Sequence, residues 1–160
     1  MIREFYIVSD SGDEYSLSLS SDGLNFSEEI RRDFGLELIS IELMRIKGSG
    51  VTSTITLKTI EEQIAGTFEE FPESILFYYC DFLNPVPTNR QGLSPQEYRS
   101  RLFSLMFQRY ITHNNISNVS DVLVTIEGED DQYFIHMIAR QQHLFIVQQL
   151  GERLRKDFEK

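Results

Sequence analysis

A single apolar run in the middle of the chain constrains the fold more than any other feature. Residues 75–80 read Ile-Leu-Phe-Tyr-Tyr-Cys and form the longest uninterrupted apolar stretch. The run is too short for an ordinary helix and is rich in aromatic side chains, so it predicts a strand that is buried on both faces. Because a central position in a sheet buries both faces of a strand, the other elements are expected to lie on either side of it.

The segment after this strand predicts a loop and then a well-capped helix. Pro85 and Pro87 prevent regular strand pairing there. Ser94 is a favourable N-cap, Pro95 suits the first helical position, and Glu97 completes a capping box. The helix is expected to bury a stripe made of Tyr98, Leu102, Leu105, Met106 and Tyr110, with Phe103 and Phe107 beside it. Its polar side is expected to contain Ser100, Arg101, Ser104 and Gln108.

Apolar periodicity divides the rest of the chain. Alternation predicts five further strands, of which the first two and the last two form hairpins, near residues 2–8, 15–19, 36–46, 122–126 and 133–137. Helical spacing predicts long helices near residues 57–71 and 142–158, together with a short helix that Ser27 caps and Gly35 ends. The strand–helix–strand order over residues 36–80 predicts a crossover unit.

These elements together predict the fold class. Residues 1–160 are expected to form a single α+β domain, with a mixed, mainly antiparallel sheet of about six strands and three main helices. At this length the core needs no support from a metal or a disulfide.

Charge and composition restrict the class of protein. The formal net charge of −10 argues against a general nucleic-acid binder, which needs a basic face. One cysteine excludes an internal disulfide. We find neither a secretory leader nor an apolar stretch long enough to span a bilayer, so a cytoplasmic location is expected and no membrane partner is predicted.

Arginines gather in one part of this acidic chain. From residue 4 to residue 73 there are 15 acidic residues and 5 basic ones, whereas from residue 90 to residue 109 four arginines accompany one glutamate. The four are Arg90, Arg99, Arg101 and Arg109. The favoured interpretation is that Arg101 forms a structural ion pair with Asp81 at the end of the central strand. The alternative is that Arg90 and one helix arginine, Arg99 or Arg101, flank a shallow pocket for a carboxylate, a phosphate or an acidic peptide.

The central segment resembles a bacterial family of unknown function. The resemblance rests on Tyr79, Cys80 and Asp81, on Arg90 and Gln91, and on the residues from Arg99 to Phe103 with the aromatic Phe107. Weaker matches occur in the first hairpin at Asp10, Gly12 and Tyr15, at Thr59 and Ile60, and in the late hairpin. This chain has a longer connection after the Cys-Asp pair, and Met106 stands where the family has tryptophan. The resemblance implies a fold and no activity.

Other chemistry-bearing residues favour structural roles. Cys80 with His113 or His136 would suit a thiol nucleophile and its base. A lone cysteine in an apolar strand is more often a small buried hydrophobe, and His136 alternates with core residues on a strand face. No catalytic residue, metal ligand or cofactor is therefore predicted.

Three classes of function remain open after these exclusions. The first is a non-enzymatic cytoplasmic protein-interaction module, for which the net charge suits a basic partner. The second is a small enzyme or ligand-binding domain that uses Cys80, Asp81 and the arginines to hold an anion. An acidic, immunity-type protein that blocks a basic active site is a third, which rests on net charge alone. The oligomeric state is not predicted.

Overall fold

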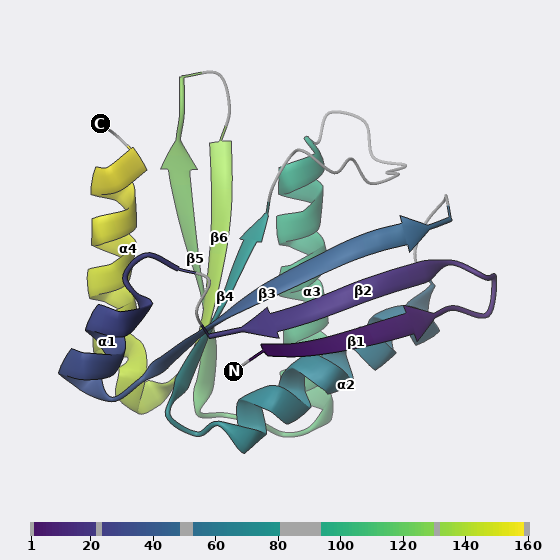
Figure 1. Ribbon diagram of the computed structural model, residues 1–160, viewed down its shortest axis with the longest axis horizontal. Helices are drawn as coiled ribbons and strands as arrows, with labels where there is room; N and C mark the ends of the chain where they lie inside the picture. Colours follow the sequence, from purple (N-terminus) through teal and green to yellow (C-terminus); the bar gives the residue numbers. More distant parts are fainter. Residues whose placement is uncertain (1, 22–23, 49–52, 81–93, 130–131, 159–160) are drawn as a thin grey trace.

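The structure confirms an α+β fold built on one six-stranded sheet (Figure 1). The computed structural model describes residues 2–21, 24–48, 53–80, 94–129 and 132–158. Across these residues the strand order is β1-β2-β3-β4-β6-β5, and each neighbouring pair is antiparallel except β3 and β4. The described residues contain four α-helices rather than the three predicted main ones, because the short helix is also formed.

The first three strands form an antiparallel meander. β1 (Ile2–Val8) and β2 (Glu14–Ser20) pair along their whole length, and the turn between them uses Gly12 at a φ of 85°. This φ lies in the region that glycine adopts without steric cost. β3 (Glu37–Lys47) pairs with the other edge of β2. The predicted first hairpin and third strand are thus confirmed.

A short helix fills the connection from β2 to β3. α1 (Ser27–Phe34) ends at Gly35, as predicted, with a φ of 68°. The predicted N-cap is wrong by one residue. Phe26 occupies the cap position, while Ser27 lies inside the first turn, and its Oγ is buried without a hydrogen-bond partner.

A helix then crosses to the central strand. α2 (Thr54–Glu70) begins after Ser53, whose Oγ accepts a 3.2 Å hydrogen bond from the backbone N–H of Thr56. β4 (Ser74–Cys80) follows and lies parallel to β3 and antiparallel to β6. The first four residues of β4 are buried, as is Cys80, which confirms a central strand.

The second half of the chain adds two helices and a hairpin. α3 (Pro95–His113) leads to β5 (Val119–Glu127) and β6 (Gln132–Arg140), which pair in register along their length. A 3-10 turn (Gln141–His143) then starts the last helix, α4 (Leu144–Phe158). β6 inserts between β4 and β5, so the late hairpin continues the sheet beyond the central strand.

The N-terminus of α3 is capped as predicted, but its buried face is rotated from the predicted stripe. Ser94 Oγ accepts a 3.2 Å hydrogen bond from the backbone N–H of Glu97. Gln96 and Ser100 are buried, whereas Leu105 is 61% exposed. Two polar residues replace an apolar one at the interface because Gln96 Nε2 and Ser100 Oγ find hydrogen-bond partners on β6.

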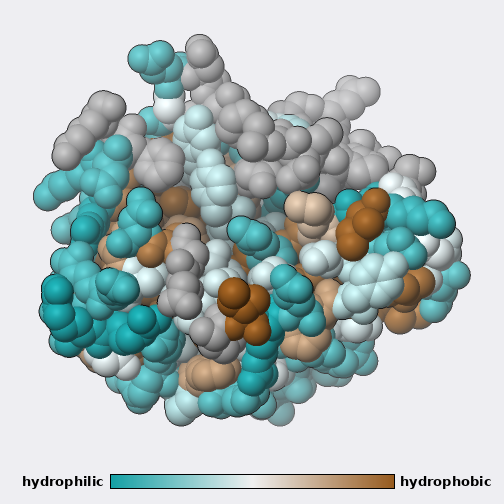
Figure 2. Space-filling model, in the orientation of Figure 1, coloured by the Kyte–Doolittle hydropathy of each residue, from teal (hydrophilic) through white to brown (hydrophobic). Residues whose placement is uncertain are grey.

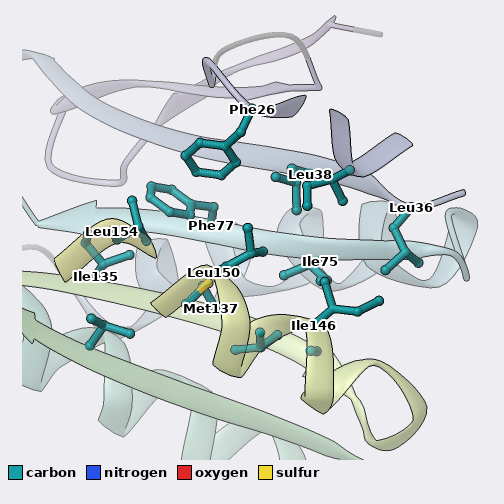
Figure 3. Packing of buried hydrophobic residues seen from close by; sticks show 14 of the residues in the cluster. Phe26, Leu36, Leu38, Ile75, Phe77, Ile135, Met137, Ile146, Leu150 and Leu154 are labelled. Atoms are coloured by element: carbon teal, nitrogen blue, oxygen red, sulfur yellow. The ribbon is translucent and has the colours of Figure 1, made fainter. Parts of the chain in front are cut away.

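Each face of the sheet carries its own core. α1 and α4 cover one face, where the residues labelled in Figure 3 pack around Ile75, Phe77 and Met137. α2 and α3 cover the opposite face, where Leu17, Ile39 and Leu76 contribute to a second core. Gly151 on α4 allows close packing, because an added Cβ would lie 3.3 Å from Val124.

The sheet opens at the carboxyl ends of its parallel pair. β3 and β4 are paired only as far as Ile41 and Tyr78. Beyond that point β3 continues to Lys47 and bends away from β4, which ends at Cys80 (Figure 1). Crevices outside the carboxyl ends of parallel strands are where open α/β sheets bind ligands. The candidate site lies in this opening between the two strands.

One face of β1–β3 carries no helix within the described residues. Three of its apolar side chains on β1 are more than half exposed, namely Ile2, Tyr6 and Val8, and Met44 on β3 is similarly exposed. Figure 2 shows apolar side chains scattered among polar ones over this part of the surface. Among the described helices, none combines the length and the apolarity needed to cross a bilayer.

Candidate functional site

A cavity of about 360 Å³ occupies the opening between β3, α2 and α3. Its floor is apolar and is formed by Ile41, Leu57, Ile60, Leu102, Phe103 and Met106. Its polar lining consists of three basic side chains and three tyrosines, namely Arg45, Lys47, Arg99, Tyr15, Tyr78 and Tyr98. We call this cavity the cationic crevice.

The meander supplies one wall of the cationic crevice. The register of the meander sets Tyr15 on β2 directly opposite Arg45 on β3. Arg45 Nη2 donates a 2.9 Å hydrogen bond to the Tyr15 hydroxyl, and the guanidinium lies 5.3 Å from the centre of the tyrosine ring. Because Tyr15 is itself buried, this contact holds the arginine in place at the end of the strand.

The first turns of α3 supply the opposite wall. Tyr98, Arg99 and Leu102 line the crevice. Arg101 lies on the exposed side of the helix instead, where its Nη2 donates a 3.0 Å hydrogen bond to Glu97. Of these two arginines, Arg99 lines the crevice and Arg101 does not.

The charge of the crevice is opposite to that of the whole chain. Among the described residues it is lined by three cations and by no aspartate or glutamate, although the net charge of the chain is −10. Guanidinium groups form strong, charge-assisted hydrogen bonds with carboxylates and phosphates. The crevice is therefore suited to an anionic group attached to an apolar body.

Arg99 stands at the gap between the separating strands. It also lines a second recess, of about 290 Å³, together with Tyr79 and with Ser16, Ser40 and Glu42 from the meander. Glu42 makes this recess less favourable for an anion than the cationic crevice. Because Arg99 lines both the cationic crevice and this recess, it lies at the point where β3 and β4 separate.

Several predicted site residues lie elsewhere. Arg90 and Asp81 are outside the described residues, so the predicted Asp81–Arg101 ion pair stays a prediction. Cys80 is fully buried at the end of β4, in agreement with a structural role. Arg109 pairs with Glu61 on α2 and so links the two helices.

A buried chain of hydrogen bonds lies next to Phe103, one of the aromatic residues that line the crevice. His136 Nδ1 is 2.9 and 3.0 Å from the two carboxylate oxygens of Asp121, and Nε2 is 2.7 Å from Ser100 Oγ. The His136 ring lies 4.9 Å from that of Phe103, which stacks on Tyr78 at 4.6 Å. Because the Asp121 carboxylate accepts a hydrogen bond from Nδ1–H, Nε2 of a neutral imidazole accepts a hydrogen bond from the Ser100 hydroxyl.

These three residues have the order of hydrogen bonds found in serine hydrolases, but not their accessibility. His136 is fully buried, and Ser100 is 3% exposed in the interior of a helix. A substrate carbonyl therefore has no approach to the Ser100 hydroxyl in this conformation. We infer that this chain of hydrogen bonds fastens α3 to β5 and β6. It thereby also fixes the position of Arg99 beside the crevice.

The sequence identified only part of this region. His136 was predicted as a packed histidine, and its partners Ser100 and Asp121 were missed. Both of its ring nitrogens are bonded to oxygen groups, which disfavours a thiol–histidine pair with Cys80. His113 is exposed at the end of α3. Among the residues that the structure describes, no three histidine, cysteine or acidic side chains group as metal ligands.

Comparison with known proteins identifies no relative. No family model matches the chain, and neither a curated protein nor a solved structure does so. The resemblance to a bacterial family therefore stays a prediction.

Proposed function

We propose that this protein is a non-enzymatic binding protein whose cationic crevice holds a ligand with an anionic group on an apolar body. The observation that carries the proposal is the lining of the crevice, in which Arg45, Lys47 and Arg99 share one cavity with an apolar floor. A cavity of a few hundred cubic ångströms with a few polar groups has the form of a small-molecule site.

The position of the crevice supports the same function. It lies at the carboxyl ends of the only parallel strand pair among the described strands. Its walls are fixed by contacts within the protein, namely the Arg45–Tyr15 hydrogen bond and the fastening of α3 through Ser100. Walls held in this way reduce the entropy that is lost when a ligand binds.

A thermal-shift panel tests the proposal. Hexanoate, benzoate and phenyl phosphate should raise the melting temperature, because a ligand that binds only the native state stabilises it. Hexanol and benzyl alcohol, which have the same apolar bodies without the charge, should raise it much less. Equal shifts for anions and alcohols, or no shift with any anion, would contradict the proposal.

If the anionic group of the ligand belongs to a peptide, the proposed binding protein is the predicted protein-interaction module. A short peptide with an apolar last residue and a free terminal carboxylate presents the same chemistry. Comparison with its amidated form separates this source from a free small molecule, since only the free carboxylate should bind. The predicted basic partner is a separate proposal, which would use the acidic surface instead of the crevice.

A further inference from the structure

We infer that the ligand of the cationic crevice is a long-chain alkyl carboxylate, whose tail runs on between α2 and α3 into a second cavity. This inference rests on the proposed function, because the same three cations would hold the carboxylate. It adds the chemical class of the ligand and the path of its apolar part.

The second cavity is almost entirely apolar. It has a volume of about 270 Å³ and lies against the same face of the sheet, further along α3. Ile64, Ala65 and Phe68 of α2 line one side, and Met106, Phe107 and Tyr110 of α3 line the other. A cavity with so little polar surface is a poor site for ordered water and a favourable one for hydrocarbon.

The two cavities meet at three shared side chains. Ile64, Phe103 and Met106 line both of them, so these residues form the partition. Phe103 is held by its stacking on Tyr78. Met106 is the adaptable member, since its unbranched thioether has several rotatable bonds and fills irregular spaces. We expect rotation of Met106 to join the two cavities into one channel.

Charge fixes the direction of the ligand. The cationic crevice is lined by three basic side chains, whereas the second cavity is lined by two glutamates, of which Glu61 is paired with Arg109. Arg140 also lines the second cavity, but its guanidinium donates to the backbone carbonyls of Phe68 and Pro72 at 2.6 and 2.8 Å. The carboxylate is therefore expected at the Arg99 end and the end of the tail near Phe107.

A chain-length series measures the inference directly. Isothermal titration of the wild-type protein with straight-chain carboxylates from six to sixteen carbons, below their micellar concentrations, gives one Kd for each length. Each methylene that enters the channel should lower Kd about fourfold, until the second cavity is full and Kd becomes constant. Alcohols of equal length should bind more weakly than the carboxylates.

A cavity-filling variant locates the tail. Ala65→Phe adds a ring in the second cavity and leaves the crevice residues unchanged, so the plateau should move to shorter chains while the Kd of hexanoate stays the same. Leu105→Phe adds bulk at an exposed position on α3 and should leave the whole series unchanged. Circular dichroism and the melting temperature of each variant establish that it is folded.

The outcomes separate this inference from the proposed function. A Kd that does not depend on chain length in the wild-type protein overturns the inference while anion binding stands, and this holds even if Ala65→Phe does not fold. Binding of the short peptide with a free terminal carboxylate, without binding of any alkyl carboxylate, also overturns the inference. Failure of every anion to bind removes the proposed function as well.

Discussion

Substitution of Asp121 should reveal whether the buried hydrogen-bond chain fastens α3 to the sheet. Asp121→Ala leaves the Nδ1–H of His136 without its acceptor, in a side chain that is fully buried. An unsatisfied buried donor costs about 1–3 kcal/mol, so we expect the free energy of unfolding to fall by about 2 kcal/mol. For a domain of this size that loss lowers the melting temperature by roughly 4–8 °C.

The assay is chemical denaturation with a matched control and a double-mutant cycle. Glu127→Ala removes a carboxylate from an exposed position on the same strand and should change stability by less than about 0.5 kcal/mol. With His136→Leu present, Asp121→Ala should cost little, because the donor it satisfies is gone. An equal cost of Asp121→Ala with and without the imidazole would refute the assigned role, as would a cost no larger than that of Glu127→Ala.

Three further predictions concern single residues. Ser94→Ala should lower the free energy of unfolding by about 1 kcal/mol, measured from denaturation midpoints, because the N-cap oxygen satisfies the Glu97 N–H; an unchanged midpoint would contradict it. Cys80→Ala should cost roughly 1 kcal/mol through a small cavity and leave ligand binding unchanged, and the native thiol should react with an aromatic disulfide reagent only after denaturation. Burial and, to a smaller degree, nearby glutamates raise the pKa of Tyr110 above its ordinary value of 10.0, so stability should fall as pH rises through that raised pKa, and Tyr110→Phe should lose less stability over the same alkaline range.

Most of the fold could be predicted because its signals are local. The apolar run at residues 75–80 identified the central strand, and Ser94 with Pro95 identified the start of α3. Alternation identified both hairpins. The N-terminus of α1 was misplaced by one residue. Serine is a favourable N-cap residue, but the Ser27 hydroxyl is buried and does not cap the helix.

The buried face of α3 could not be predicted from α3 alone. Helical spacing favoured Leu105 over Ser100 as a core residue. The partner that makes Ser100 acceptable in the core is His136, 36 residues further along the chain and on a strand. A buried polar residue can be recognised only when both partners are known, and a helical pattern contains only one of them.

The candidate site was predicted in part for the same reason. The arginine-rich segment predicted Arg99 as a candidate site residue, and Arg99 lines the crevice. Arg45 and Lys47 were missed because they occur in the acidic part of the sequence, at the end of a strand where basic residues usually face solvent. Only the pairing of β3 with β4 and the position of α3 bring them to the same cavity as Arg99.

Titration of one carboxylate against three proteins tests anion binding at the crevice most directly. Hexanoate should bind the wild-type protein and Arg101→Gln with the same Kd, because Arg101 lies outside the crevice on the same helix. Loss of a charge-assisted hydrogen bond in Arg99→Gln should weaken binding by roughly tenfold or more. Equal Kd values for all three proteins, or a loss in Arg101→Gln equal to that in Arg99→Gln, would show that the anion does not bind in the crevice.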